Sequence, residues 1–119
     1  MTSKTHLEFV QIDEKGWSVP EGYPPTITQK LLVDDLDPAA KTGQRSLLMR
    51  FAPGAATTEP FAHAECEEVF IYEGDLIVGS DPNDAVQFHA PAYACRPGNV
   101  WHGPFRSERG CLMFVHFHY

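Results

Sequence analysis

Residues 61–74, FAHAECEEVFIYEG, place a histidine and several glutamates directly before an apolar run. Imidazole and carboxylate groups are both ligands for divalent metals in proteins. In an extended strand alternate side chains share one face of the sheet. The residues that would share one face here are Phe61, His63, Glu65, Glu67, Val69 and Ile71. Because valine and isoleucine belong to this set, we expect the face to point into the core.

A histidine and a carboxylate that face a core need partners, because an unpaired buried charge is strongly destabilising. A divalent metal is one such partner. An arginine or tyrosine side chain, or water at the open mouth of a barrel, would serve equally well. The segment therefore identifies His63 and Glu67 as candidate metal ligands without deciding between these possibilities.

The composition describes an ordinary acidic domain. The chain has 119 residues, enough for one domain with a core that needs no metal or disulfide to fold. Its formal net charge of −7 disfavours direct binding to nucleic acids. A small neutral or metal-chelating substrate is compatible with this charge.

The three cysteines are widely spaced and form no CxxC pair, which indicates reduced thiols rather than a disulfide framework. The first residues contain no apolar run of the secretory kind, and no stretch approaches the roughly 20 apolar residues of a membrane span. We therefore expect a cytoplasmic protein with no membrane segment.

Ten prolines and nine glycines separate short apolar segments, a pattern typical of an all-β sandwich or barrel. A tight turn is predicted at residues 73–74. Strands are predicted at residues 7–12, 26–34, 45–52, 67–74, 75–79, 85–90, 92–96, 100–102 and 111–119.

Two motifs resemble those of the cupins, which are small β-barrels. Glu67 stands seven residues before Gly74 and four after His63, as in the first cupin motif, G-x5-H-x-H-x3–4-E-x6-G. Phe61 occupies the position of the first histidine of that motif, which is a departure from the pattern. The segment RPGNVWHGP, residues 96–104, resembles the second motif, with His102 as its histidine and one extra residue before it. The order of segments from residue 17 to 116 is similar to the ChrR-like branch of the family.

The resemblance implies a cupin double-stranded β-helix, also called a jelly-roll barrel, over residues 17–119, preceded by an N-terminal strand arm over residues 1–16. It also implies that His63, Glu67 and His102 bind a divalent metal. Two imidazoles and one carboxylate suit Fe²⁺ or catalytic Zn²⁺, with Mn²⁺ and Ni²⁺ as further possibilities. Glu65 is a candidate additional ligand.

Several other residues are candidates for a substrate pocket beside this metal. Phe61 would line it, Tyr93 and Trp101 would wall it or serve as plain core aromatics, and His89 would line it or be a hydrogen-bonded strand residue. Arg96 would anchor a substrate carboxylate or form a surface ion pair. These candidate pocket residues are Phe61, Tyr93, Trp101, His89 and Arg96.

The resemblance favours a metal-dependent enzyme that acts on a small oxygenated organic molecule. Dioxygenase-like cleavage of a carbonyl or phenolic compound is the leading reaction, with Glu67 or Glu65 moving protons. Isomerase, lyase and hydrolase chemistry on the same scaffold, and a non-catalytic module that binds a small molecule or regulates a partner, are the alternatives. A homodimer is expected, paired through an edge strand at residues 7–12 or 111–119.

Overall fold

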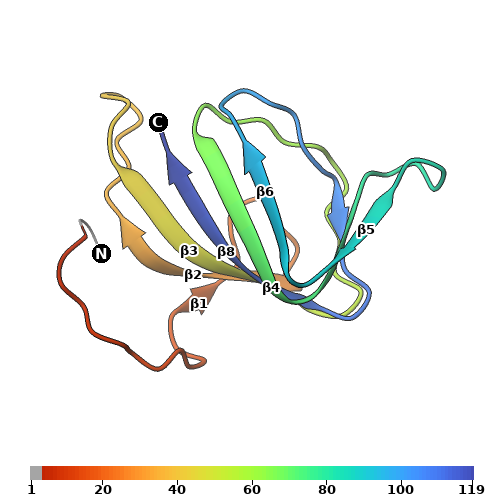
Figure 1. The fold of residues 1–119 in the computed structure, drawn as a ribbon, viewed down its shortest axis with the longest axis horizontal. Helices are drawn as coiled ribbons and strands as arrows, with labels where there is room; N and C mark the ends of the chain where they lie inside the picture. The colour runs from red at the N-terminus through yellow and green to blue at the C-terminus, as the bar shows by residue number, and fades with distance from the viewer. Residues whose placement is uncertain (1–3) are drawn as a thin grey trace.

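The computed structural model describes residues 4–119, which form eight strands and no helix (Figure 1). Every strand pair is antiparallel, and the order across the sheet is β1-β2-β3-β8-β4-β5, with β6 and β7 also paired to β4. The predicted all-β fold is confirmed. The strands are β1 (Trp17–Ser18), β2 (Ile27–Asp34), β3 (Gln44–Phe51), β4 (Cys66–Val78), β5 (Val86–His89), β6 (Ala92–Arg96), β7 (Phe105–Arg106) and β8 (Cys111–His118).

The curved sheet encloses the core on its inner face. Along β4 the side chains alternate as predicted, with Glu67, Val69 and Ile71 buried. Buried residues of β2, β3 and β8 belong to the same apolar cluster. The buried apolar cluster consists of Ile27, Leu47, Phe51, Ala55, Val69, Ile71, Leu76, Cys111, Met113 and Val115. Within residues 4–119, no helix has the length and apolar character required to cross a membrane.

The longest strand, β4, changes partners along its length. Up to Ile71 it pairs with β6, and from Asp75 onward it pairs with β5 and then β7. A bulge between Ile71 and Glu73 and a φ of 83° at Gly74 mark this change. A side chain at Gly74 would collide with the carbonyl oxygen of Gly110, so glycine is required there. The predicted tight turn at residues 73–74 is wrong, because the chain continues as one bent strand.

Asp75 lies just past this bend and is fully buried. Its carboxylate accepts hydrogen bonds from the Ser107 hydroxyl at 3.1 Å and from the backbone N–H groups of Glu108 and Arg109 at 3.1 and 2.8 Å. The Gln87 amide donates a fourth at 3.1 Å. Burial would raise the pKa of Asp75, but these donors outweigh it and lower that pKa to about 2. Asp75 therefore fixes the loop between β7 and β8.

The C-terminal strand β8 lies in the middle of the sheet. It pairs with β3 over residues 111–118 and with β4 over the same residues. The prediction that residues 111–119 form a free edge is therefore wrong. The sequence pattern could not distinguish these positions, since an apolar strand reads alike at an edge and at the centre of a sheet.

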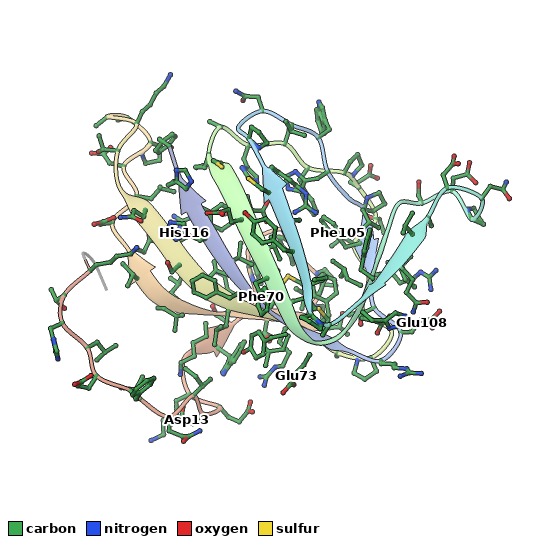
Figure 2. The ribbon with its side chains drawn as sticks, in the orientation of Figure 1. Asp13, Phe70, Glu73, Phe105, Glu108 and His116 are labelled. Atoms are coloured by element: carbon green, nitrogen blue, oxygen red, sulfur yellow. The ribbon has the colours of Figure 1, made fainter. Side chains whose placement is uncertain are left out.

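The N-terminal arm carries no strand, which corrects the prediction for residues 7–12; the first three residues of the predicted arm lie outside the described chain. The arm is extended and exposed, and Phe9 has its whole side chain in solvent. It is tied to β3 by Lys4, which hydrogen-bonds Gln44, and by Glu14, which pairs with Arg50. Figure 2 shows Asp13 on this arm, below the sheet. No neighbouring strand pairs with residues 7–12, and the homodimer stays a prediction.

Candidate metal centre

Two loops are joined by backbone hydrogen bonds at the open end of the sheet. The N–H of Phe61 donates to the carbonyl of His102 at 2.7 Å, and the N–H of His102 donates back to Phe61 at 2.8 Å. Asn99 donates to the carbonyl of His63 at 2.7 Å. A side chain at Gly98 would collide with the backbone of the other loop, which explains the glycine of the RPG segment. The extended conformation considered for residues 61–65 and the strand predicted at residues 100–102 are thus replaced by two loops with a single bridge between them.

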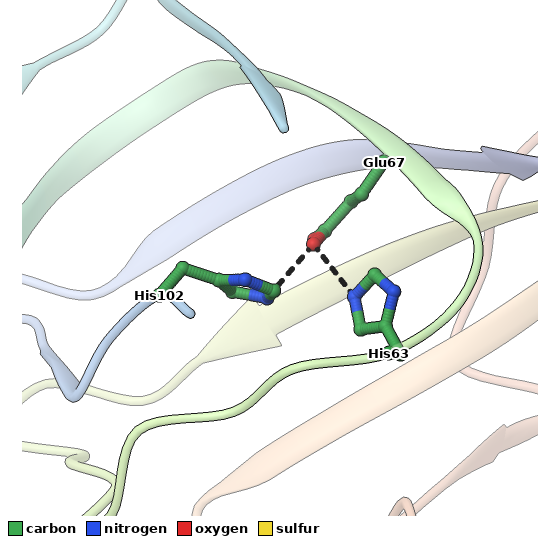
Figure 3. A group of neighbouring side chains, drawn as sticks. All are labelled: His63, Glu67 and His102. Carbon is green, nitrogen blue, oxygen red and sulfur yellow. Dashed lines mark hydrogen bonds and ion pairs between the residues drawn. The ribbon is translucent and has the colours of Figure 1, made fainter. Parts of the chain in front are cut away.

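This pairing brings His63 and His102 to Glu67 on β4 (Figure 3). The Nε2 atoms of His63 and His102 lie 3.1 and 3.0 Å from the same carboxylate oxygen, Oε2 of Glu67. One donor atom from each of the three residues lies within 4.8 Å of the other two. The side chains of His102 and Glu67 are 8% and 11% exposed, so water has little access to them.

The other ring nitrogens show which atoms are free to bind a metal. Nδ1 of His63 is 3.0 Å from the carbonyl oxygen of Glu65, and Nδ1 of His102 is 2.9 Å from that of Val100. Since a carbonyl oxygen only accepts, each Nδ1 carries the hydrogen, and each Nε2 of a neutral ring presents a lone pair. When an Nε2 atom carries a hydrogen, it donates to Glu67. Once both Nε2 atoms are free of hydrogen, two lone pairs and a carboxylate oxygen converge with no donor between them. This donor set fits a cation, with the backbone orienting both rings as in metal sites.

The charge of Glu67 is stabilised despite its burial. Burial would raise the pKa of Glu67, but the hydrogen bond from His102 and the nearby charges of Arg96 and His63 outweigh this effect and lower it. Arg96 is the cross-strand partner of Glu67 on β6, with Nη1 3.9 Å from Oε2. The carboxylate is therefore ionised and available as a ligand at neutral pH.

A cavity of about 440 Å³ opens beside the three residues. Its walls are mostly aliphatic and aromatic, and Glu67 and Arg96 are the lining residues with charged side chains. Phe105 of β7, labelled in Figure 2, lines it on the side of the molecule that carries β5 and β6. The cavity is of the size and polarity typical of a small-molecule site.

Comparison with known proteins agrees with this geometry. A family model described as the ChrR Cupin-like domain matches residues 5–119. The chain is a ChrR-like cupin. The bent, all-antiparallel sheet is accordingly the predicted cupin jelly roll. No curated protein sequence matches this cupin.

Solved structures resemble the cupin in fold at low sequence identity. An acetylacetone dioxygenase from Acinetobacter johnsonii is 20% identical, with a TM-score of 0.74 over 98% of this chain and 76% of that one. An RmlC-like cupin from Shewanella frigidimarina is 18% identical, with a TM-score of 0.70 over 99% and 94%. An HTH_3 family transcriptional regulator from Vibrio cholerae is 15% identical, with a TM-score of 0.63 over 87% and 56%. These similarities show the fold and leave the activity open.

Phe61 makes this cupin's site a three-residue cluster with an aromatic wall. Its ring stacks on Tyr23 at 5.4 Å between centroids and on Phe105 at 6.2 Å, and lies 6.1 Å from the His102 ring. Phe117 contacts the ring of His63 edge-on from β8 at 5.5 Å. The position that holds a histidine in the family motif is therefore apolar, and it faces the cavity.

Tyr23 was missed by sequence reasoning. It lies in the proline- and glycine-rich segment before β2, which gave no periodic signal. Burial and the charge of Glu67 raise the pKa of Tyr23, so its hydroxyl stays protonated beside the cluster. An aromatic residue between turn residues was the only available signal.

The remaining predicted site residues divide into two groups. Phe61, Tyr93 and Arg96 line the cavity, although the Tyr93 hydroxyl turns away to donate to Glu68 at 2.5 Å. Trp101 and His89 lie outside it and are exposed, because the 99–102 loop and β5 turn these side chains to solvent.

Glu65 also lies outside the cavity lining, because the strand begins one residue later and the predicted alternation does not reach it. Its carboxylate is 3.4 Å from Nδ1 of His63, on the side away from Glu67. Glu65 thus lies behind the His63 ring, where it helps orient that ring.

Proposed function

We propose that this cupin is a metal-dependent enzyme whose substrate is a small oxygenated organic molecule. Dioxygenase-like cleavage of a carbonyl or phenolic compound is the leading reaction. The observation that carries the proposal is the convergence of His63, Glu67 and His102 at the wall of a mostly apolar cavity. Fe²⁺ and Zn²⁺ fit two imidazoles and one carboxylate best, with Mn²⁺ and Ni²⁺ as further candidates.

The residues of the chain have separate tasks in this proposal. His63, Glu67 and His102 hold the metal, which when bound would polarise an oxygen atom of the substrate and, if redox-active, react with dioxygen. Phe61, Tyr23 and Phe105 exclude water and hold an apolar or flat substrate against one wall. Glu65 keeps the His63 ring in place from behind.

Metal content tests the proposal directly. The protein is purified and incubated with Fe²⁺ or Zn²⁺ under anaerobic conditions, desalted, and measured by elemental analysis. We expect one metal per chain in the wild type, and loss of that metal in His63→Ala and His102→Ala. His89→Ala, an exposed histidine outside the cavity, is the matched control and should keep its metal.

A second assay tests which reaction the metal-loaded protein catalyses. Oxygen uptake is followed with the Fe²⁺ protein and acetylacetone, the compound in the name of the Acinetobacter structure, beside other dicarbonyl and phenolic compounds. Uptake that disappears in His102→Ala supports dioxygenase chemistry. A loaded protein that converts these compounds without oxygen uptake supports an isomerase or lyase instead.

A non-catalytic module that binds a small molecule or regulates a partner is the second candidate. It is favoured by Phe61, which removes one donor of the family motif, and by the structural similarity to a transcriptional regulator. A protein that takes up none of the four metals would support this candidate. The expected homodimer and cytoplasmic location accompany either function.

A further inference from the structure

Arg96 is a charged side chain that faces the interior. It is the last residue of β6 and lies directly across from Glu67 of β4, so the two side chains share the inner face of the sheet. Its side chain is 17% exposed and lines the cavity. Strand alternation turns Cys95 and the hydroxyl of Tyr93 to the outer face, which leaves Arg96 as the cation of this wall.

The guanidinium of Arg96 has few partners for its degree of burial. Its nearest acidic atom is Oε2 of Glu67 at 3.9 Å, beyond hydrogen-bonding distance, and it lies 5.3 Å from the ring of Phe105. The more exposed Arg50, by contrast, donates two hydrogen bonds to Glu14 at 3.1 and 2.9 Å. A guanidinium has five N–H donors, so Arg96 keeps donors free toward the cavity.

Metal binding would remove the one negative charge near Arg96. Glu67 is the acidic residue of the cavity lining, and as a metal ligand it directs its charge to the ion. The site would then hold a divalent cation and a guanidinium against a single carboxylate. A buried site with excess positive charge favours an anionic ligand, because an unpaired buried charge is destabilising.

We propose that the cavity selects small organic acids, with the carboxylate of the ligand on Arg96 and a neighbouring oxygen directed to the His63–Glu67–His102 cluster. The proposal rests on the metal site proposed above. Since Nη1 of Arg96 is only 3.9 Å from the shared oxygen of Glu67, the two ligand oxygens must be close together. A 2-oxo or 2-hydroxy acid meets this requirement.

The other lining residues of the cavity indicate which kind of group such an acid would carry. Tyr23, Phe61 and Phe105 stack in series, with interplanar angles of 13° and 16°, and all three line the cavity. Aliphatic side chains of β4 and β8 also line the cavity. A flat or branched apolar group attached to the acid is therefore favoured over a polar one.

Calorimetry on the Zn²⁺-loaded protein tests the inference without relying on activity, since Zn²⁺ has no redox chemistry. The probes are phenylpyruvate and 1-phenylpropan-2-one, which share the phenyl group and the ketone and differ in the carboxylate. We expect the wild type to bind the acid at least about tenfold more tightly than the ketone. Arg96→Gln should weaken acid binding about 10–100-fold and leave ketone binding unchanged.

Two further variants control for charge and for global effects. Arg96→Lys keeps the charge without the planar fork and should restore part of the acid affinity. Arg106→Gln removes an arginine that is 53% exposed and paired with Glu108, and should behave as the wild type. Zinc content and thermal melting are measured first on each variant to establish that it is folded and loaded.

Different outcomes separate the inference from the proposed function. If the Zn²⁺-loaded wild type and Arg96→Gln bind phenylpyruvate equally well, the inference is overturned. The proposed metal-dependent function is unaffected by that result. A wild type that takes up no metal would overturn the proposed function and the inference with it. Loss of acid preference confined to Arg96→Gln establishes the carboxylate site.

Discussion

Two buried carboxylates lie on β4, with Glu67 near the start of the strand and Asp75 past its bend. Asp75 accepts hydrogen bonds from four protein groups at 2.8–3.1 Å. Glu67 meets two imidazole nitrogens through one oxygen, and its nearest guanidinium atom is 3.9 Å away. The hydrogen bonds of Asp75 all come from the protein itself. Glu67, in contrast, is surrounded by imidazole nitrogens and a guanidinium that could also bind a metal ion or a ligand.

This difference separates a structural carboxylate from a binding one. A fully hydrogen-bonded carboxylate stabilises the fold around it, because removal of the acceptor would leave several donors unpaired. A carboxylate that shares an oxygen with two metal-capable nitrogens stabilises the fold less and is available to a ligand. Asp75 is 0% exposed and Glu67 is 9% exposed, so burial alone does not distinguish them.

The largest effect should come from truncation of Asp75. Asp75→Ala leaves the Ser107 hydroxyl and the N–H groups of Glu108 and Arg109 without an acceptor, and we expect a loss of about 3–5 kcal/mol in the free energy of unfolding. Glu67→Gln keeps the shape of the side chain and a hydrogen-bonding oxygen, so it should cost less stability in the metal-free protein than Asp75→Ala, and it should abolish metal retention. Urea unfolding and elemental analysis measure the two effects.

Ser107→Ala is the matched control for this pair, since it removes one donor of the four and should cost about 1 kcal/mol. Equal destabilisation by Asp75→Ala and Glu67→Gln would contradict the distinction between the two carboxylates.

Acid should affect the Asp75 region in a defined pH window. Because the folded-state pKa of Asp75 is about 2, below its ordinary value of 3.8, the folded chain holds this group ionised where the unfolded chain has bound a proton. Its contribution to stability is complete well above pH 4 and is lost as the pH falls toward 2. The urea midpoint of the wild type should therefore fall more steeply over this window than that of Asp75→Asn. Parallel curves for the two proteins would show that Asp75 contributes nothing to acid sensitivity.

A substitution at position 61 should have a smaller effect and should raise the metal affinity of the site around Glu67. Phe61→His places an imidazole at the position that holds a histidine in the family motif, where the Phe61 ring now lies 6.1 Å from that of His102. A fourth protein ligand should tighten Zn²⁺ binding by about tenfold or more, a gain measured by competition with a chelator.

Phe61→Leu is the control for this gain, because it removes the stacked ring without adding a donor atom. If both variants bind Zn²⁺ as the wild type does, position 61 does not limit the site.

The sequence predicted the parts of this molecule that depend on local alternation. Val69 and Ile71 point inward as the period of two requires, and Glu67 follows them because it shares their strand. His63 also arrives at the site, but through backbone hydrogen bonds between two loops rather than through alternation. The motif spacing located it because the spacing reflects this loop geometry.

Other features could not be predicted, because they depend on which segments meet in space. The central position of β8 is a property of pairing order, which an apolar strand pattern does not encode. Asp75 directly follows the tight turn that was predicted at residues 73–74, so its burial was not expected. Its partners in the 107–109 loop are more than thirty residues away in the chain. Tyr23 gave still less signal, since no periodic segment surrounds it.

The central position of β8 also constrains how the protein is made. β3 and β4 do not pair with each other, and each hydrogen-bonds to residues 111–118 instead. During synthesis the two halves of the sheet therefore stay apart until residues 111–118 have left the ribosome. The earlier strands, the loops and the candidate ligand residues emerge first. Their unpaired strand edges are then exposed to chaperones and to neighbouring nascent chains.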